Sequence, residues 1–143
     1  MSNLIKFPDK TTLTYPKKDF FSDFYNNLDV HPDNKQLMKN VNERAVVRAI
    51  KNLLFTNKYE RLFQPDIGCD IRKLLFEPIT PITVSNIKTV IETTIQRYEP
   101  RAGLLEVIVT PYIDENLISV TIKFFISNSQ ESTTFTVQLS RVR

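Results

Sequence analysis

A Glu-Pro-Arg triplet, Glu99, Pro100 and Arg101, carries the side chains with the clearest potential for chemistry. The proline ring fixes its own φ and holds an acid and a base at a stiff corner. Paired with Asp66 or Asp70, Glu99 would supply the two carboxylates that glycoside hydrolysis uses. Arg101 opposes this role, because a nearby cation favours the ionised form of an acid, whereas a general acid must carry its proton. We therefore predict no catalytic residues.

Two interpretations of the triplet stay open. In the first, Glu99 and Arg101 form a local ion pair where a helix ends. In the second, the corner docks on a partner, and Arg101 forks to a carboxylate or a backbone carbonyl of that partner. The residue types alone favour neither interpretation.

The other reactive side chains lack partners that the sequence can supply. Cys69 is the only cysteine and His31 the only histidine, and they lie far apart along the chain. A Cys–His nucleophile and a zinc site are therefore not expected. The two glycines, Gly68 and Gly103, stand in no phosphate-binding motif. We predict no metal and no cofactor.

The length and composition are those of one soluble domain. Of the 143 residues, 41% are hydrophobic, and such a chain buries a core without a disulfide or a metal. No apolar run reaches the roughly 20 residues of a membrane span. The net charge is only +3, with no basic cluster beyond Lys17 and Lys18. We expect neither a membrane nor a nucleic-acid partner. One cysteine and no secretory leader indicate a reducing compartment such as the cytoplasm.

The sequence predicts three helices, two before the triplet and one that ends at it. Apolar residues at helical spacing predict a helix over 43–55, with Asn42 as its N-cap. A short helix is expected from Ile71 to Glu77, where a following proline stops it.

The longest helix is predicted to begin at residues 80–83 and to end near Glu99, at the triplet. Its apolar stripe consists of Val84, Ile87, Ile91, Ile95 and Tyr98. In the loop between the first two helices, Pro65 and Gly68 mark a turn, and we expect a positive φ at Gly68.

After Gly103 the apolar period changes to two, which is typical of strands. Leu105, Val107 and Val109 form one alternating set. Longer sets occupy residues 118–126 and 135–139. Short polar links favour an antiparallel meander with the 117–126 strand in its centre. The predicted fold is α+β with two layers, in which the helices cover one face of a three-stranded sheet.

Residues 1–40 contain three prolines and no sustained periodicity, so we predict an extended arm before a domain that covers residues 41–143. Phe20, Phe21, Phe24 and Tyr25 cluster within this arm. The cluster is expected to form a short helix that packs back on the domain, and the alternative is an aromatic knob for a partner.

The last strand is predicted to be a sheet edge without the usual protection. Soluble proteins blunt such edges with lysine, proline or bulges, yet residues 133–140 contain no charge and no proline. The edge is either covered by the N-terminal arm or used to accept a strand from a partner. Its candidate residues are Thr134, Phe135, Thr136, Val137, Gln138 and Leu139.

The order of several motifs resembles the baseplate wedge, or sheath-initiator, family of contractile tails. The motifs are IKNLLFT (50–56), YERLFQPDIG (59–68), LLFEP (74–78) and RYEPR (97–101), followed by strands. The resemblance covers about residues 20–140, and the family includes so-called lysozyme-like wedge proteins of T4-type phages and counterparts in type VI secretion systems and tailocins. Many members carry a glycine where this chain has Tyr59, and the arm before residue 20 has no counterpart.

The resemblance implies a structural protein of the virion tail baseplate, assembled in the host cytoplasm in six-fold copies. It implies that Glu99, Pro100 and Arg101 dock on a helical core bundle of larger wedge proteins. It also implies that arms of the tail sheath subunits add strands to the sheet, and that tube-proximal hub proteins are further candidate partners. A peptidoglycan-degrading tail enzyme and a tail or head adaptor that never contacts sheath are the alternatives.

Overall fold

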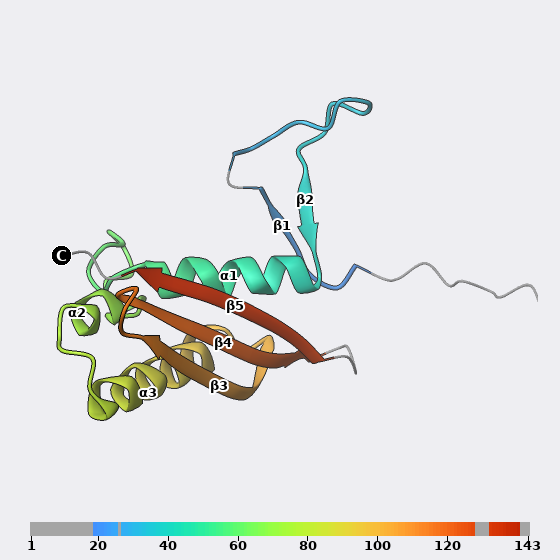
Figure 1. Ribbon diagram of the computed structural model, residues 1–143. Coiled ribbons are helices and arrows are strands. Elements are labelled where there is room, and N and C mark those ends of the chain that lie inside the picture. Colours follow the sequence, from blue (N-terminus) through green and yellow to red (C-terminus); the bar gives the residue numbers. More distant parts are fainter. Residues whose placement is uncertain (1–18, 26, 128–131, 141–143) are drawn as a thin grey trace, which may run out of the picture.

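The computed structural model describes residues 19–25, 27–127 and 132–140. Its main sheet has three antiparallel strands: β3 (Ala102–Tyr112), β4 (Leu117–Ile126) and β5 (Ser132–Ser140). The order is β3-β4-β5, with β4 in the centre (Figure 1). Val120 of β4 lies opposite Val109 on one side and Val137 on the other. The predicted meander is confirmed.

Strand β4 buries one face, as its two-residue period predicted. The buried side chains are Ile118, Val120, Ile122, Phe124 and Ile126. On β5, Val137 and Leu139 continue this apolar face and are only 6% and 5% exposed. Because alternate side chains point to opposite faces, the polar residues of both strands lie on the other side of the sheet.

Strand β3 departs from the prediction at a β-bulge. The pairing register with β4 shifts between Leu104 and Glu106, and the extra residue turns Leu105 outward, where it is 57% exposed. Leu104 packs against the core instead, and Val107 is buried as predicted. The inward position predicted for Leu105 was wrong, because a strict alternation cannot anticipate an inserted residue.

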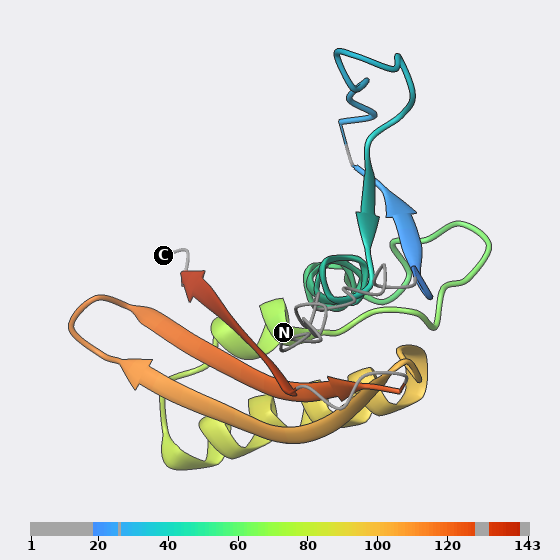
Figure 2. The ribbon, with the colours of Figure 1, turned by 90° about the vertical axis from the view of Figure 1, so that its right-hand side faces the viewer.

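Within the described residues, three helices complete the fold: α1 (Glu43–Phe55), α2 (Ile71–Leu75) and α3 (Pro81–Tyr98). The apolar stripes of α1 and α3 join the buried face of the sheet in one core. Helix α3 packs along β3 (Figure 2). This arrangement confirms the predicted α+β fold with helices on one face of the sheet.

Helix α3 has well-defined ends because its sequence supplies the signals for both. The Thr80 hydroxyl accepts the Thr83 N–H at 3.2 Å, and Pro81 occupies the first turn, where a missing N–H costs nothing. The stripe then buries three isoleucines completely: Ile87, Ile91 and Ile95. The packing of these isoleucines holds the helix against the sheet and thereby fixes the position of its C-terminal end, where the Glu-Pro-Arg triplet lies.

Asn42 precedes α1 as predicted but does not cap it with its side chain. Its Oδ1 instead accepts the backbone N–H groups of Phe20 at 2.9 Å and Phe21 at 3.3 Å. Asn42 has a φ of 48° and a ψ of −113°, a positive-φ conformation that is uncommon for residues other than glycine. It thus ties the preceding segment to the start of α1.

The aromatic segment is a strand, so the predicted short helix was wrong. Strand β1 (Ser22–Phe24) pairs with β2 (Lys39–Val41) in a separate antiparallel ribbon, which stands away from the main sheet (Figures 1 and 2). Phe21 packs against the core, whereas Phe24 is 47% exposed. A strand pair of this kind depends on a partner far along the chain, which local aromatic clustering does not reveal. Residues 1–18 of the predicted arm lie outside the described residues.

Candidate functional site

The Glu-Pro-Arg triplet forms the corner between α3 and β3. Glu99 is the C-cap of α3, and its N–H donates to the Ile95 carbonyl at 2.8 Å. The Ala102 N–H donates back to the Glu99 carbonyl at 3.1 Å and closes the turn. Pro100 is exposed at the outside of this corner. The helix ends here because a residue before proline is disfavoured in the helical region.

Glu99 and Arg101 form a bidentate ion pair. Arg101 Nε donates to Glu99 Oε1 at 2.6 Å, and Nη2 donates to Oε2 at 2.7 Å. Glu99 is buried at 6% exposure, whereas the Arg101 side chain is 34% exposed. The hydrogen bonds that Arg101 donates to Glu99 raise the pKa of the Arg101 guanidinium above its usual value. Both carboxylate oxygens are therefore occupied inside the molecule.

The guanidinium of Arg101 also lies over an aromatic ring from the N-terminal ribbon. Its Cζ is 5.5 Å from the centre of the Phe21 ring, a distance at which a cation is attracted to the ring face. The ion pair and the ring fix the side chain on two sides. The sequence identifies Phe21 as one of four clustered aromatic residues. It does not predict that the Phe21 ring lies beneath the Arg101 guanidinium.

A small polar hollow of about 230 Å³ lies beside Glu99. Asp23 and Arg61 share it with Glu99 and Tyr98. Neither of the acids that the sequence offered as partners, Asp66 and Asp70, lines this hollow with Glu99. The Asp70 carboxylate accepts a hydrogen bond from Lys73 at 3.3 Å, and the backbone carbonyl of Asp66 accepts the Tyr98 hydroxyl at 2.7 Å.

The loop over residues 56–70 has two backbone positions in the positive-φ region. Gly68 has a φ of 154°, and a Cβ there would lie 2.6 Å from the backbone carbon of Asn57. The predicted positive φ at Gly68 is confirmed. Tyr59 has a φ of 69° without being glycine. The Tyr59 N–H donates to the Pro65 carbonyl at 2.7 Å. This hydrogen bond links the predicted turn at Pro65 and Gly68 to Tyr59.

The tip of this loop carries two adjacent apolar side chains in solvent. Leu62 is 92% exposed and Phe63 is 97% exposed. Adjacent large apolar residues on a surface mark interaction sites more often than isolated ones do. The sequence-based predictions did not include this pair. The signal that could have revealed it is that the segment lacks any apolar period that would direct both side chains into the core.

The outer edge of β5 is open among the residues that the structure describes, because β5 pairs with β4 alone. Thr134, Thr136 and Gln138 are exposed on the outer face. Phe135, Val137 and Leu139 face the core. The described part of the N-terminal segment pairs with itself as β1 and β2 and adds no strand to this edge.

Cys69 is a buried packing residue in this arrangement. The Thr94 hydroxyl donates to its Sγ at 3.6 Å, and burial raises the pKa of the Cys69 thiol. His31 lies in the ribbon connection, where its Nδ1 accepts the Asp33 N–H at 3.3 Å. Across the described ranges, no three metal-binding side chains gather in one place. The helices described there include none with the length and apolarity to cross a bilayer.

Comparison with known proteins gives concordant matches. The family model for baseplate wedge protein gp25 matches residues 40–131, more than half of the chain. The baseplate wedge protein gp25 of Enterobacteria phage T4 is 32% identical over 98 residues, which are 68% of this chain and 74% of that protein.

Solved structures share the fold. A Geobacter sulfurreducens protein described as a tail lysozyme has a TM-score of 0.64 at 23% identity, over 68% of this chain and 89% of that one. A chain of the anti-feeding prophage baseplate has a TM-score of 0.59 at 22% identity, over 86% and 87%. A chain of the post-contracted pyocin R2 baseplate has a TM-score of 0.51 at 20% identity, over 66% and 91%.

Proposed function

The chain belongs to the gp25 family of baseplate wedge proteins, and on this premise we propose that it is a two-ended adaptor without catalytic turnover. One end is the Glu99–Pro100–Arg101 corner, which docks on a helical core bundle of larger wedge proteins. The other end is the outer edge of β5, which accepts a strand from the tail sheath and starts sheath polymerisation. The protein is a structural component of the baseplate of a contractile tail.

The contrast between the two edges of the sheet carries the proposal for β5. Strand β3 has the devices that block strand addition: a bulge at Leu104–Glu106, the charge of Glu106, and Pro111 near its end. Strand β5 has none of these between Ser132 and Ser140. One edge is thus protected and the other is left competent for main-chain hydrogen bonding, the basis of β-augmentation.

Several contacts support the corner as the second docking end. Glu99 and Phe21 hold the Arg101 guanidinium in place, while a third of the Arg101 side chain stays exposed. A fork held in this way loses little side-chain entropy when it binds a carbonyl or carboxylate. The proposed role of the internal ion pair is therefore to pre-organise the docking corner.

The loop over residues 56–70 extends the same surface. It lies against the corner, since Arg61 shares a hollow with Glu99 and the Asp66 carbonyl accepts the Tyr98 hydroxyl. We include Leu62 and Phe63 in the docking surface, because helical bundles offer grooves in which apolar anchors dominate binding. The charged corner then sets orientation and the apolar tip supplies affinity.

The engagement of Glu99 argues against hydrolysis. A general acid needs a proton to donate, yet both Glu99 oxygens accept hydrogen bonds from Arg101. We expect the purified protein to be inactive on peptidoglycan from pH 4 to 8 in a turbidity assay. Clearing of cell walls that Glu99→Gln abolishes would restore the enzyme as the better hypothesis.

A proline pair in β5 tests the role of the edge. In an antiparallel strand, successive N–H groups point to opposite edges. One of the two variants Thr136→Pro and Val137→Pro therefore removes a hydrogen bond to β4, and the other removes an N–H that points outward. Amide hydrogen exchange of the natural protein identifies the variant with the outward position, because an N–H without a partner in β4 exchanges faster. We expect baseplates with that variant to assemble but to carry no extended sheath in electron micrographs.

The control for this test is a proline at Thr110, on the edge of β3 that is already protected. Sheath of normal length on baseplates with the outward β5 proline would refute strand addition. Sheath loss with Thr110→Pro as well would show that any distortion of the sheet is sufficient, and would remove the special role of β5.

A further inference from the structure

A trough runs beside the open edge of β5, and helix α1 forms its other wall. Helix α1 and strand β5 lie side by side and run in the same direction (Figure 1). One hollow joins α1 residues between Glu43 and Asn52 to Thr133 and Phe135, and Tyr25, Asn27 and Asn40 of the N-terminal segment also line it. Another joins Leu54 and Phe55 at the end of α1 to the last residues of β5. A strand added to β5 would therefore lie with one row of side chains over α1.

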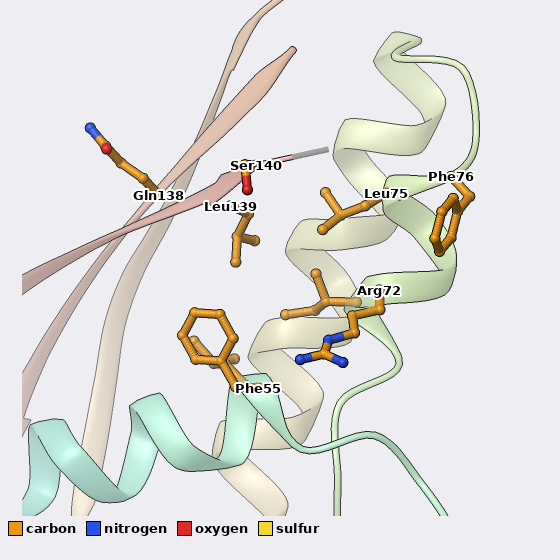
Figure 3. A pocket seen from close by; sticks show the side chains of 9 residues that line it. Phe55, Arg72, Leu75, Phe76, Gln138, Leu139 and Ser140 are labelled. Carbon is orange, nitrogen blue, oxygen red and sulfur yellow. The ribbon is translucent and has the colours of Figure 1, made fainter. Parts of the chain in front are cut away.

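The hollow at the C-terminal end of β5 is apolar. It has a volume of about 470 Å³ and lies between α1, α2 and β5. Phe55, Leu75 and Leu139 point toward one another across it, whereas Gln138 points away (Figure 3). The guanidinium of Arg72 lies at its margin. Such a hollow suits one large apolar side chain, and an apolar anchor in a pocket is the usual source of affinity in peptide recognition.

The hollow at the N-terminal end of β5 is basic. Its volume is about 580 Å³, and α1 contributes three cations, Arg44, Arg48 and Lys51, against one acid, Glu43. Arg48 also lies 5.9 Å from the centre of the Tyr25 ring. Arg44 and Lys51 are exposed. Charge complementarity at this end therefore favours an acidic side chain.

We propose that the trough selects an extended partner segment with a defined pattern: an acidic side chain over Phe135 and a large apolar side chain over Leu139. This inference rests on the proposed function, because it specifies the sheath segment that β5 accepts. The two positions are four residues apart, about 13 Å along a strand. An even spacing places both side chains on the same face, toward α1.

Synthetic peptides test the pattern directly. The first of three nine-residue peptides carries Glu and Leu four residues apart, the second has the same composition with Glu and Leu three residues apart, and the third matches the first except that Lys replaces Glu. We expect the first to bind the full chain at least about tenfold more tightly than the others, with affinity falling as salt rises from 50 to 500 mM. Fluorescence anisotropy gives the affinities.

Charge-reversal variants locate the acidic end. Lys51→Glu should weaken the Glu peptide about fivefold and leave the Lys peptide unharmed or improved, as expected for charges at a solvated site. Lys58→Glu, with the same change of net charge in the loop outside the trough, is the matched control and should change affinity less than twofold. Equal effects of the two variants would overturn the assignment.

Hydrogen exchange separates failure of this inference from failure of the proposed function. Peptides that protect β5 amides whatever their spacing and charge would leave strand addition intact and refute the selective trough. Sheath subunits that bind without protecting β5 would refute the proposed function itself. If the peptides bind only after residues 1–18 have been deleted, this chain's own N-terminal residues occupy the trough, and the proposal of a partner segment is wrong.

Discussion

Replacing Arg101 by alanine should destabilise the fold through the carboxylate that it leaves behind. Glu99 is 6% exposed, and both of its oxygens accept hydrogen bonds from Arg101 at 2.6 and 2.7 Å. Loss of one partner of a fully buried pair costs about 3–5 kcal/mol, whereas an exposed pair contributes at most about 1 kcal/mol. Because the Arg101 side chain is 34% exposed, we expect a loss of about 2 kcal/mol.

A double variant identifies the source of this loss. Arg101→Met keeps most of the apolar stem over Phe21, and Glu99→Gln removes the buried charge. The pair Glu99→Gln with Arg101→Met should therefore lie within about 1 kcal/mol of the natural protein, because replacing both members of a buried pair is far less costly than removing one.

Urea denaturation followed by circular dichroism measures both effects. The transition midpoint of Arg101→Ala should fall while its slope stays constant. If Arg101→Ala and the double variant lose the same free energy, the stranded carboxylate is not the cause and the reasoning about the fork is wrong. The result also decides how docking assays with Arg101 variants are interpreted. A destabilised wedge protein would assemble poorly because of its lower stability as well as because of the lost docking contact.

Three further predictions concern single positions in the loop over residues 56–70, one of them compared with a glycine of β3. Tyr59→Gly should be about 1 kcal/mol more stable than Tyr59→Ala, because the φ of 69° suits glycine; thermal melts compare them. Gly68→Ala should cost more than Gly103→Ala, since the new Cβ meets fixed backbone at Gly68 but only the movable Phe125 ring at Gly103; equal losses in urea would contradict this. Phe63→Ser should change stability by less than about 0.5 kcal/mol yet weaken wedge incorporation in pull-down assays.

Periodicity predicted those elements whose environment follows from local sequence. Strand β4 buries the side chains expected of it, and helix α3 buries Ile87, Ile91 and Ile95, because one continuous apolar face requires burial wherever the element packs. Val84 and Tyr98, at the two ends of the predicted α3 stripe, are only half-buried. The hairpin of β1 and β2 was missed, since Ser22 pairs with Val41 and neither short segment has a period of its own. The bulge at Leu105 was missed for a related reason: one inserted residue reverses the alternation.

The candidate site was predicted in part. The corner itself followed from Pro100, whose ring ends the helix wherever it falls. The contacts of Arg101 did not follow, because the choice between Glu99, Phe21 and a partner depends on segments that are distant in the chain. Likewise the bare edge of β5 followed from its composition, but the trough beside it needed the position of α1.

The central claim is that the sheath adds a strand to β5 in the assembled baseplate. Hydrogen exchange of this chain, measured in baseplates with and without sheath, tests it most directly. We predict that alternate amides of β5 become at least about tenfold slower to exchange when sheath is present, while the amides on the protected edge of β3 do not change. Unchanged exchange in β5, with new protection on β3 or on the loop over residues 56–70, would contradict the claim.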